Sequence, residues 1–516
     1  MANLKIENVS LEGINAQENR AIVQFDIAWD EAWKNDVNCD GAWVFAKFRV
    51  RGGRWSHVTL RTASSNDFNY QDQTPPLFSK GSGGTSSDMG MWVPDTQKGV
   101  FIFRTREEGD VRAKQVQLVW DWGKDGVRAE DIGAVELKVF GLEMVYVPGD
   151  QHYVGDPRGA DGPVNCLYTY PNGGAYLINS EAALSVDAKE GCLYCDQDND
   201  RSRDGVPFVI PEAFPKGYKA FWYMKYEMSS QQYVDFLNTL TRKQQSIHVR
   251  SNISTDYIEN YYVMTNTNTE RFRQTIVCAR RDNGTEKPVT FYTYAPARAC
   301  NAIAWCDVAA YAAWAALRPV TELEFEKACR GPAKPVPSEC AWGSTEVGRV
   351  DTFDGPDGSG YERKVPTSGL VNACLGSGIA PFKAAQGQTE PDNPGFEGPV
   401  SCGLFANTRH AGVPKRLNDG ASYYGIMELS GNVWEPCISL GHPKGRAYKP
   451  THGDGSLDED GYARVPNWPD ESGAGAGVRG GVYRSPDASY LAIALRFAAA
   501  HVKAEPRYNG GCRVGF

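Results

Sequence analysis

Hydrophobic and polar residues alternate along much of the first 142 residues of the chain. The clearest stretch runs from Val23 to Trp29, where hydrophobic residues occupy every second position, the pattern of a half-buried strand. Similar runs predict further strands at residues 42–50, 99–104, 115–122 and 134–140. Short strands separated by turn-rich stretches, such as residues 81–87, are typical of an immunoglobulin-like β-sandwich. We therefore expect an all-β sandwich at residues 1–142, acting as a spacer or docking domain or as a second binding surface.

The pattern changes near Leu142, and we expect residues 143–516 to form a second domain. Two helix starts carry a capping-box pattern, Ser229 with Gln232 and Thr321 with Glu324, each followed by hydrophobic residues at helical spacing. A helix rich in small residues is expected at residues 305–316. The remaining sequence is rich in Gly, Pro, Asn and Asp, which predicts long ordered loops of the kind that carry function. The predicted fold class is α+β.

Charge and hydropathy exclude several classes of partner. The 516 residues carry a net charge of −9, so we expect no nucleic-acid partner, because such a partner needs a basic face. No apolar run approaches the roughly 18 residues of a membrane span, so no membrane insertion is expected. The first residues lack the apolar core of a signal peptide. We expect an extracellular, cell-surface or virion-associated protein that has lost a leader or is exported without one.

The thirteen cysteines are scattered along the chain, apart from the pair Cys192 and Cys195. We expect mostly buried thiols with one or two bridges, because disulfide-rich scaffolds are shorter and denser in cysteine. The pair itself fits free thiols, a disulfide or half of a metal site. The acidic stretch from Asp196 to Gly205 follows directly, and it fits either a calcium loop or a solvated acidic loop.

Five ordered motifs in the second domain resemble the formylglycine-generating-enzyme family, whose fold is a large variant of the C-type lectin fold. The motifs are Met144–Gly155, Phe221–Met228 with the helix after it, Arg318–Gly331, Tyr424–Glu435, and the closing pair Arg479–Gly481 and Gly511–Arg513. The resemblance implies a C-type lectin domain with long ordered loops at residues 143–516. It also implies a structural calcium ion near Asn432 and Glu435, both of which supply oxygen ligands.

The resemblance does not extend to the chemistry of the family. Its enzymes use two copper-binding cysteines just after the Arg-Gly-Gly, which by position would fall near Ser485 and Tyr490, and neither of these is a cysteine. The related iron-dependent enzymes need a histidine-rich metal site, and the seven histidines here include none paired at helical ligand spacing. Cys512 lies in the closing motif, where a buried thiol is expected. We therefore expect no catalytic residue and no catalytic cofactor.

The segment 479–516 resembles the variable region of ligand-binding proteins from diversity-generating retroelements, including phage receptor-binding proteins. Two glycine-containing anchors flank a stretch rich in aromatic and polar residues, as in a binding surface built from rigid aromatic anchors and adaptable polar contacts. We expect residues 491–495 to be partly buried as a core strand. The expected ligand contacts are Val482, Tyr483, Arg484, Ser485, Asp487, Ser489, Tyr490, Arg496, Phe497, His501, Lys503, Glu505, Arg507 and Tyr508.

These observations predict a non-catalytic protein whose C-terminal face, at about residues 482–509, recognises a surface protein or a glycan. Oligomerisation, or attachment to a larger particle through residues 1–142, is compatible with this function. Two alternatives remain open at this point. One is a structural subunit of a phage tail or contractile particle, and the other is an oxidoreductase of the same fold with a shifted site that uses Cys512.

Overall fold

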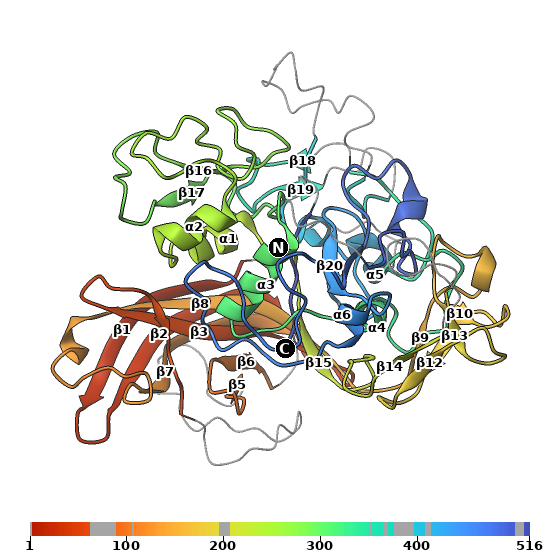
Figure 1. Cartoon of the computed structure of the whole chain (residues 1–516), viewed down its shortest axis with the longest axis horizontal. Coiled ribbons are helices and arrows are strands. Elements are labelled where there is room, and N and C mark those ends of the chain that lie inside the picture. The colour runs from red at the N-terminus through yellow and green to blue at the C-terminus, as the bar shows by residue number, and fades with distance from the viewer. Residues whose placement is uncertain are drawn as a thin grey trace.

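The computed structural model describes most of the chain and shows how its two halves are joined (Figure 1). The described residues are 3–61, 89–105, 108–195, 207–350, 353–364, 370–375, 397–407, 414–500 and 510–516. The turn-rich stretch predicted at residues 81–87 and the acidic stretch from Asp196 to Gly205 lie outside these residues. No described helix is both long and apolar enough to cross a membrane.

The N-terminal strands form two sheets. The first has the order β1-β2-β7, with bounds β1 (Lys5–Asn15), β2 (Arg20–Ala32) and β7 (Gly109–Asp121). The second has the order β15-β8-β3-β6-β5, with β4 paired to β3. Its bounds are β3 (Asp40–Val50), β4 (Ser56–His57), β5 (Met89–Trp92), β6 (Val100–Arg104), β8 (Val135–Val147) and β15 (Phe221–Met224). The five predicted strands are therefore present.

A hydrophobic core joins the two sheets. It contains Phe25 and Trp29 from β2, Val44 and Phe48 from β3, and Trp120 from β7. The alternation predicted for β2 is confirmed, since every second residue of its central part is buried. The immunoglobulin-like sandwich stays a prediction, because the second sheet is completed by β15, a strand from the C-terminal half.

The expected boundary at residue 142 falls inside β8, which runs unbroken from Val135 to Val147. The first part of β8 pairs with β3, and its end pairs with β15, where Val147 lies opposite Phe221. A core crosses the same boundary. The ring of Phe101 stacks on that of Trp222 with a centroid separation of 4.5 Å, and the indole of Trp43 donates to the carbonyl of Ala315 at 2.8 Å. The two halves are thus packed into one body (Figure 1).

The three predicted helices are present as α1 (Ser230–Leu237), α3 (Trp305–Trp314) and α4 (Glu322–Arg330). Both predicted capping boxes are confirmed, because Ser229 and Thr321 each accept from the backbone three residues later and receive the reciprocal side-chain bond. The structure adds three short helices, α2 (Arg242–His248), α5 (Lys415–Asp419) and α6 (Pro443–Arg446). Helix α2 has a Thr241–Gln244 capping box of the same kind, which the sequence analysis missed.

Most of the C-terminal half consists of long loops held by short strands. These are β9 (His152–Val154), β10 (Tyr168–Thr169), β11 (Tyr176–Ile178), β12 (Leu184–Val186), β13 (Leu193–Tyr194), β14 (Phe208–Ile210), β16 (Ile276–Cys278), β17 (Phe291–Thr293), β18 (Phe353–Asp354), β19 (Arg363–Lys364), β20 (Glu435–Ile438) and β21 (Ala476–Arg479). The described residues also contain the 3-10 turns η2 (Ile132–Ala134), which precedes β8, and η3 (Gly159–Asp161), η4 (Leu404–Asn407) and η5 (Ala488–Leu491). The chain ends beside β15, where the amide of Trp222 donates to the carbonyl of Phe516 at 3.0 Å.

Candidate functional site

The double glycine after β21 turns the chain into a closed loop. Strand β21 pairs antiparallel with β20 and ends at Arg479. Gly480 and Gly481 follow with φ of 91° and 74°, a backbone region that glycine adopts without strain. A Cβ atom on Gly481 would lie only 2.6 Å from the carbonyl oxygen of Tyr490. The glycine pair therefore lets the start and end of residues 481–490 lie against each other.

Within this loop, side chains divide into a buried set and an exposed set. Arg484, Asp487, Ser489 and Tyr490 are exposed, as is Pro486. Residue Asp487 also fixes the turn η5, since its carboxylate accepts from the backbone and the hydroxyl of Ser489 at 2.9 and 2.5 Å. The exposed side chains thus stand on a loop whose backbone is ordered by local hydrogen bonds.

Three of the expected contact residues are not on the surface. Val482, Tyr483 and Ser485 are 3%, 0% and 3% exposed, so the expectation that their side chains face a ligand is wrong. The amide of Tyr483 donates to the carbonyl of Asn432 at 2.8 Å, and its ring packs in a core cluster with Val433. The Ser485 hydroxyl accepts from the amide of Val482 at 2.9 Å. These residues anchor the loop to the domain.

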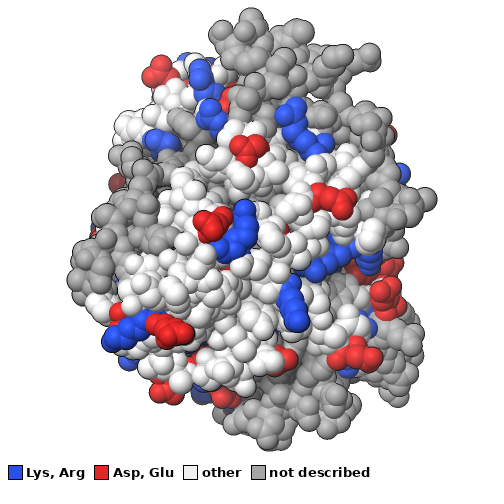
Figure 2. All heavy atoms as spheres, turned by 90° about the vertical axis from the view of Figure 1, so that its right-hand side faces the viewer, with Lys and Arg blue, Asp and Glu red and all other residues white. Residues whose placement is uncertain are grey.

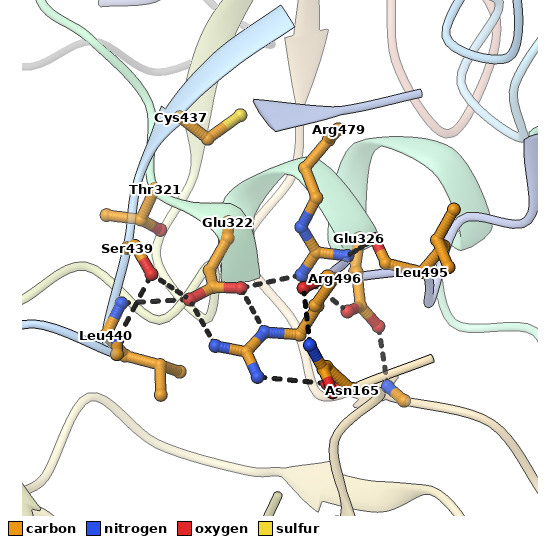
Figure 3. A network of polar contacts seen from close by, with 12 residues as sticks. Asn165, Thr321, Glu322, Glu326, Cys437, Ser439, Leu440, Arg479, Leu495 and Arg496 are labelled. Atoms are coloured by element: carbon orange, nitrogen blue, oxygen red, sulfur yellow. Dashed lines mark hydrogen bonds and ion pairs between the residues drawn. The ribbon is translucent and has the colours of Figure 1, made fainter. Parts of the chain in front are cut away.

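Arg496 was also expected on the ligand face, and the structure corrects this position. The residue is fully buried, and its guanidinium donates to both carboxylate oxygens of Glu322, Nε to Oε2 at 2.5 Å and Nη2 to Oε1 at 3.1 Å (Figure 3). A buried guanidinium needs such a partner, because an unpaired charge in the interior is costly. Its third bond goes to the carbonyl of Asn165 at 3.0 Å.

Glu322 is the centre of a buried ionic network beneath the loop (Figure 3). It also accepts from Arg479 Nη2 at 2.8 Å and from the Ser439 hydroxyl and Leu440 amide at 3.0 and 2.9 Å. Burial alone would raise the pKa of this carboxyl, but Arg496 and Arg479 outweigh burial and hold the pKa at about 2. Glu322 is therefore charged in the folded protein, and the network ties α4, β20 and β21 to the C-terminal segment.

A second carboxylate, that of Glu326, extends the network to the backbone of Gly155. Glu326 accepts from Arg479 Nη2 at 3.0 Å and from the Gly155 amide at 2.6 Å. Arg479 also donates through Nη1 to the carbonyls of Ile493 and Leu495 at 2.9 and 3.2 Å. Hydrogen bonds from charged side chains in the core thus hold the backbone of residues 493–496. This part of the segment therefore has a fixed position.

The core strand expected at residues 491–495 is wrong as to its conformation, although its burial is largely confirmed. Leu491 and Ile493 are 0% and 1% exposed, whereas Leu495 is partly exposed. The backbone forms η5 followed by turns, because its carbonyls bond to Arg479 and to the hydroxyl of Ser430 rather than to a neighbouring strand.

The exposed part of the site combines the cation of Arg484, the carboxylate of Asp487 and a row of aromatic rings. The Arg484 side chain, 46% exposed, pairs with Glu397 at 3.1 Å and lies over the ring of Phe272 with 5.8 Å between the guanidinium carbon and the ring centroid. The Tyr490 ring meets Phe497 edge-on at 6.1 Å, and Phe497 lies 5.6 Å from Trp434. Phe497 is partly exposed, as expected for a contact residue.

The remaining expected contacts lie outside the described residues. They are His501, Lys503, Glu505, Arg507 and Tyr508. The chain is described again from Gly510, where a parallel bridge to Trp434 begins the closing motif.

Asn432 and Glu435 lie in the core, and their oxygen atoms serve protein donors. The Asn432 side-chain oxygen accepts from the Val400 amide at 2.8 Å. The Glu435 carboxylate accepts from Arg513 Nε at 2.8 Å and from the Tyr223 hydroxyl at 3.0 Å. A calcium site needs six to eight oxygen ligands around one ion, whereas Arg513 already supplies the positive charge beside Glu435. The two residues therefore do not fit a shared calcium site. No group of three or more His, Cys, Asp or Glu side chains within the described ranges forms a metal site.

The cysteines are structural thiols. All thirteen are free, and all except Cys192 and Cys306 are buried, so the expected one or two bridges are wrong and the expected buried thiols are confirmed. Burial raises the pKa of the Cys512 thiol well above its ordinary value, which makes it a poor nucleophile. Cys512 is therefore unsuited to the shifted active site considered above.

Three residues of the site were not predicted as ligand contacts. Trp434 belongs to the motif Tyr424–Glu435, and Glu397 and Phe272 come from loops distant in sequence. The signal for Trp434 was available, because a tryptophan in a loop-rich domain packs where loops meet. The sequence carries no signal that places Phe272 and Glu397 beside Arg484, since that contact depends on three loops from separate parts of the chain.

The surface on the right-hand side of Figure 1 carries charges of both signs. Figure 2 shows Lys and Arg side chains interspersed with Asp and Glu among uncharged residues on this face. Such a surface matches partners through local charge pairs rather than through a field of one sign.

Comparison with known proteins gives one match. Residues 179–514 match the family model described as a sulfatase-modifying factor enzyme 1-like domain. Among curated proteins, none matches the chain. The matched range begins after the first motif at Met144–Gly155 and contains the other four.

Proposed function

The chain belongs to the sulfatase-modifying factor enzyme 1-like family, and we propose that it is a non-catalytic member that binds a ligand through the exposed side chains of its C-terminal segment. These side chains are Arg484, Asp487, Ser489, Tyr490 and Phe497. The proposal narrows the face expected from the sequence, because Val482, Tyr483, Ser485 and Arg496 are buried.

The observation that supports the proposal is that neighbouring residues of the loop differ in burial. Arg484 is exposed between two buried residues, Tyr483 and Ser485. The buried residues fix the backbone, and the exposed ones contribute little to the core. A surface mutation away from packing features usually changes stability by less than about 0.5 kcal/mol. The exposed positions can therefore change, and with them the ligand, while the fold stays the same.

The chemistry of the exposed set suits a protein or glycan ligand. Tyr490 and Phe497 offer aromatic surface with few rotatable bonds, which binds at a low cost in conformational entropy. Arg484 and Asp487 provide a donor group and an acceptor group of opposite charge. Tyrosine and arginine are also the residues that most often dominate the binding energy of interfaces. The ligand of such a face lies outside the cell or on a particle surface.

The non-catalytic assignment is supported by the residues at the family's cysteine positions. Ser485 is buried and bonded to the backbone of Val482, and Tyr490 is an exposed ring. Neither side chain supplies a thiolate to bind copper, and the thiol of Cys512 is buried with a raised pKa.

Diversification by a retroelement is the finer part of the proposal. It predicts that sibling genes differ at the codons for the exposed residues and share those for the buried ones, with a near-copy repeat and a reverse transcriptase nearby. Sequencing the 3′ ends of sibling genes tests this. An identical segment in all isolates, without a repeat, would leave a binding protein of fixed specificity.

The binding function itself can be tested with one pair of variants. Tyr490→Ser removes the exposed ring at the centre of the face, and Tyr218→Ser removes a ring of similar exposure, 37% against 36%, elsewhere on the domain. The whole protein and both variants are screened against an array of purified surface proteins and glycans. We expect a ligand that the protein and Tyr218→Ser bind and that Tyr490→Ser binds at least about tenfold more weakly. Equal binding of the ligand by all three proteins would show that the proposed C-terminal face does not bind it.

A further inference from the structure

A small sheet formed by residues 258–294 carries an exposed surface that the proposed function does not use. Strands β16 and β17 pair antiparallel, with Val277 opposite Tyr292, and Tyr262 bridges to Val277 from the other side. The Tyr261 carbonyl extends this third strand by accepting from the Cys278 amide at 3.2 Å. Figure 1 shows β16 and β17 at the upper left, away from the blue C-terminal loops at the upper right.

The sheet is held rigidly against α1. Asn238, at the end of α1, brackets the backbone of Phe291 with two hydrogen bonds of 2.9 Å, one from its amide group and one to its side-chain oxygen. Phe291 and Cys278 are 2% and 1% exposed and belong to the main hydrophobic core, so they supply the apolar anchor of the sheet. Val277, which lies opposite Tyr292, is on the other side of the sheet.

Tyrosines are nonetheless concentrated on the outer side. Tyr257, Tyr292 and Tyr294 are 48%, 43% and 57% exposed, and Tyr261 is partly exposed. We name this surface the tyrosine–arginine face and define it as Tyr257, Tyr261, Arg280, Arg281, Tyr292 and Tyr294. Exposed aromatic residues and arginine gathered in one place mark interaction sites rather than ordinary surface.

The two arginines are held on tyrosine rings. The guanidinium carbon of Arg280 lies 5.1 Å from the ring centroid of Tyr261, and that of Arg281 lies 5.6 Å from Tyr257. Stacking on a ring leaves most N–H groups at the edge of a guanidinium available to a carboxylate. Arg280 uses one of them on the carbonyl of Glu259, at 3.5 Å from Nη2. None of the ion pairs found among the described residues involves either arginine.

The carboxylate nearest to the turn after Arg281, that of Asp256, is engaged by the backbone. The Asp256 carboxylate accepts from the backbone amides of Asp282 and Gly284 at 3.3 and 2.7 Å. It caps the turn after Arg281 rather than pairing with the arginine. The face therefore offers two preorganised cationic groups to an outside partner.

We infer that the tyrosine–arginine face docks a carboxylate-bearing segment of a partner protein, in addition to the ligand of the C-terminal face. The rings of Tyr292 and Tyr294 lie at 81° to each other, and those of Tyr261 and Tyr262 at 43°. This geometry does not make the flat platform on which sugar rings stack in a row. It presents ring faces and edges to aliphatic side chains, while Arg280 and Arg281 receive the carboxylates.

The test uses the whole protein and fluorescent peptides of defined charge. The probe is a peptide of alternating glutamate and proline, in which proline keeps the chain extended and gives the tyrosines apolar surface. Matched peptides carry glutamine or lysine in place of glutamate, and a neutral glycan array tests the other class of partner. The variants are Arg280→Glu with Arg281→Glu, and Tyr292→Ser with Tyr294→Ser. Their controls are Arg54→Glu and Tyr423→Ser, exposed residues outside the face.

The glutamate peptide is expected to bind the protein and both controls, with the affinity at least about tenfold lower for each double variant, and the glutamine and lysine peptides are expected to bind far more weakly. Unchanged binding by the double variants, equal binding of all three peptides, or no peptide binding at all would each overturn the inference. Binding of glycans in place of peptides would also overturn it. The Tyr490→Ser variant leaves this face intact. If it still binds the glutamate peptide, the docking inference holds whether or not the C-terminal face binds a ligand.

Discussion

Arg496 and Glu322 are 174 positions apart and form a fully buried, two-bond ion pair. The pair joins the C-terminal segment to the start of α4. It shows that a charged residue inside the segment expected to contact a ligand can belong to the scaffold. The proposed ligand face therefore comprises the exposed residues between such anchors.

Replacing Arg496 should destabilise the protein far more than replacing Arg484. Arg496→Ala leaves Glu322 with one guanidinium fewer in the interior, and breaking a buried pair in this way costs about 3–5 kcal/mol. Arg484→Ala breaks a half-exposed pair with Glu397, which costs about 0–1 kcal/mol. Urea denaturation followed by tryptophan fluorescence measures both. Similar losses of unfolding free energy for the two variants would show that the network does not stabilise the C-terminal segment.

Glu428 should make the protein less stable as pH rises through neutrality. Burial raises the pKa of its carboxyl to about 7, although Arg513 acts to lower it. One oxygen accepts from the Gly403 amide at 2.8 Å, and the other has no hydrogen-bond partner among the described residues. The carboxyl therefore holds a proton in the folded protein at mildly acidic pH.

The direction of this effect follows from the raised pKa. The folded state binds the proton more tightly than the unfolded state, so the stabilisation is complete below the ordinary value of 4.5 and is lost as pH rises through about 7. At about 1.4 kcal/mol per pH unit, the loss amounts to about 3 kcal/mol. Glu428→Gln keeps the bond to Gly403 and should remove this dependence. Parallel stability curves for the protein and the variant between about pH 5 and pH 8 would contradict the assignment.

Calcium should not stabilise the protein through Asn432 and Glu435. Their oxygens already accept from Val400, Arg513 and Tyr223. An ion that bound the folded state alone would raise Tm increasingly as its concentration exceeds Kd. We expect the same Tm in excess calcium and in excess chelator. A rise of several degrees in calcium that disappears in Asn432→Ala would show that the site accepts the ion after rearrangement.

Thiol reactivity should follow burial. Cys192 is partly exposed, whereas Cys512 is fully buried and the pKa of its thiol is raised by that burial. Iodoacetamide at neutral pH should therefore alkylate Cys192 first and leave Cys512 unmodified until the protein unfolds. Mass spectrometry of digests taken over time measures the order. Early alkylation of Cys512 would show that its thiol is accessible and reactive in the folded protein.

Features that depend on neighbouring residues could be predicted from the sequence. The capping boxes at Ser229 and Thr321 are local hydrogen-bond patterns, and the alternation from Val23 to Trp29 reports one buried face of a strand. The family motifs likewise predicted the domain that residues 179–514 match. The missed capping box at Thr241 carried the same local signal.

Features that depend on distant partners could not be predicted. Tyr483 and Arg484 are neighbours of similar interfacial character, yet the first is buried against residues near Val433 and the second is exposed beside Phe272. The unbroken course of β8 past residue 142 depends on pairing with β15, about 75 residues later. Composition changes at that point of the sequence, but the sheet continues.

Exposed positions of the C-terminal loop are proposed to determine the ligand, while the buried positions hold the fold. Two libraries of the whole protein test this proposal most directly, one randomised at Arg484, Asp487, Ser489 and Tyr490, and the other at Val482, Tyr483, Ser485 and Arg496. Each is displayed, sorted for protease resistance and then selected on purified surface proteins and glycans. We expect that most of the first library folds and yields binders of new specificity, whereas most of the second is degraded. Equal survival of the two libraries, or a surviving first library in which no residue changes binding, would contradict the proposal.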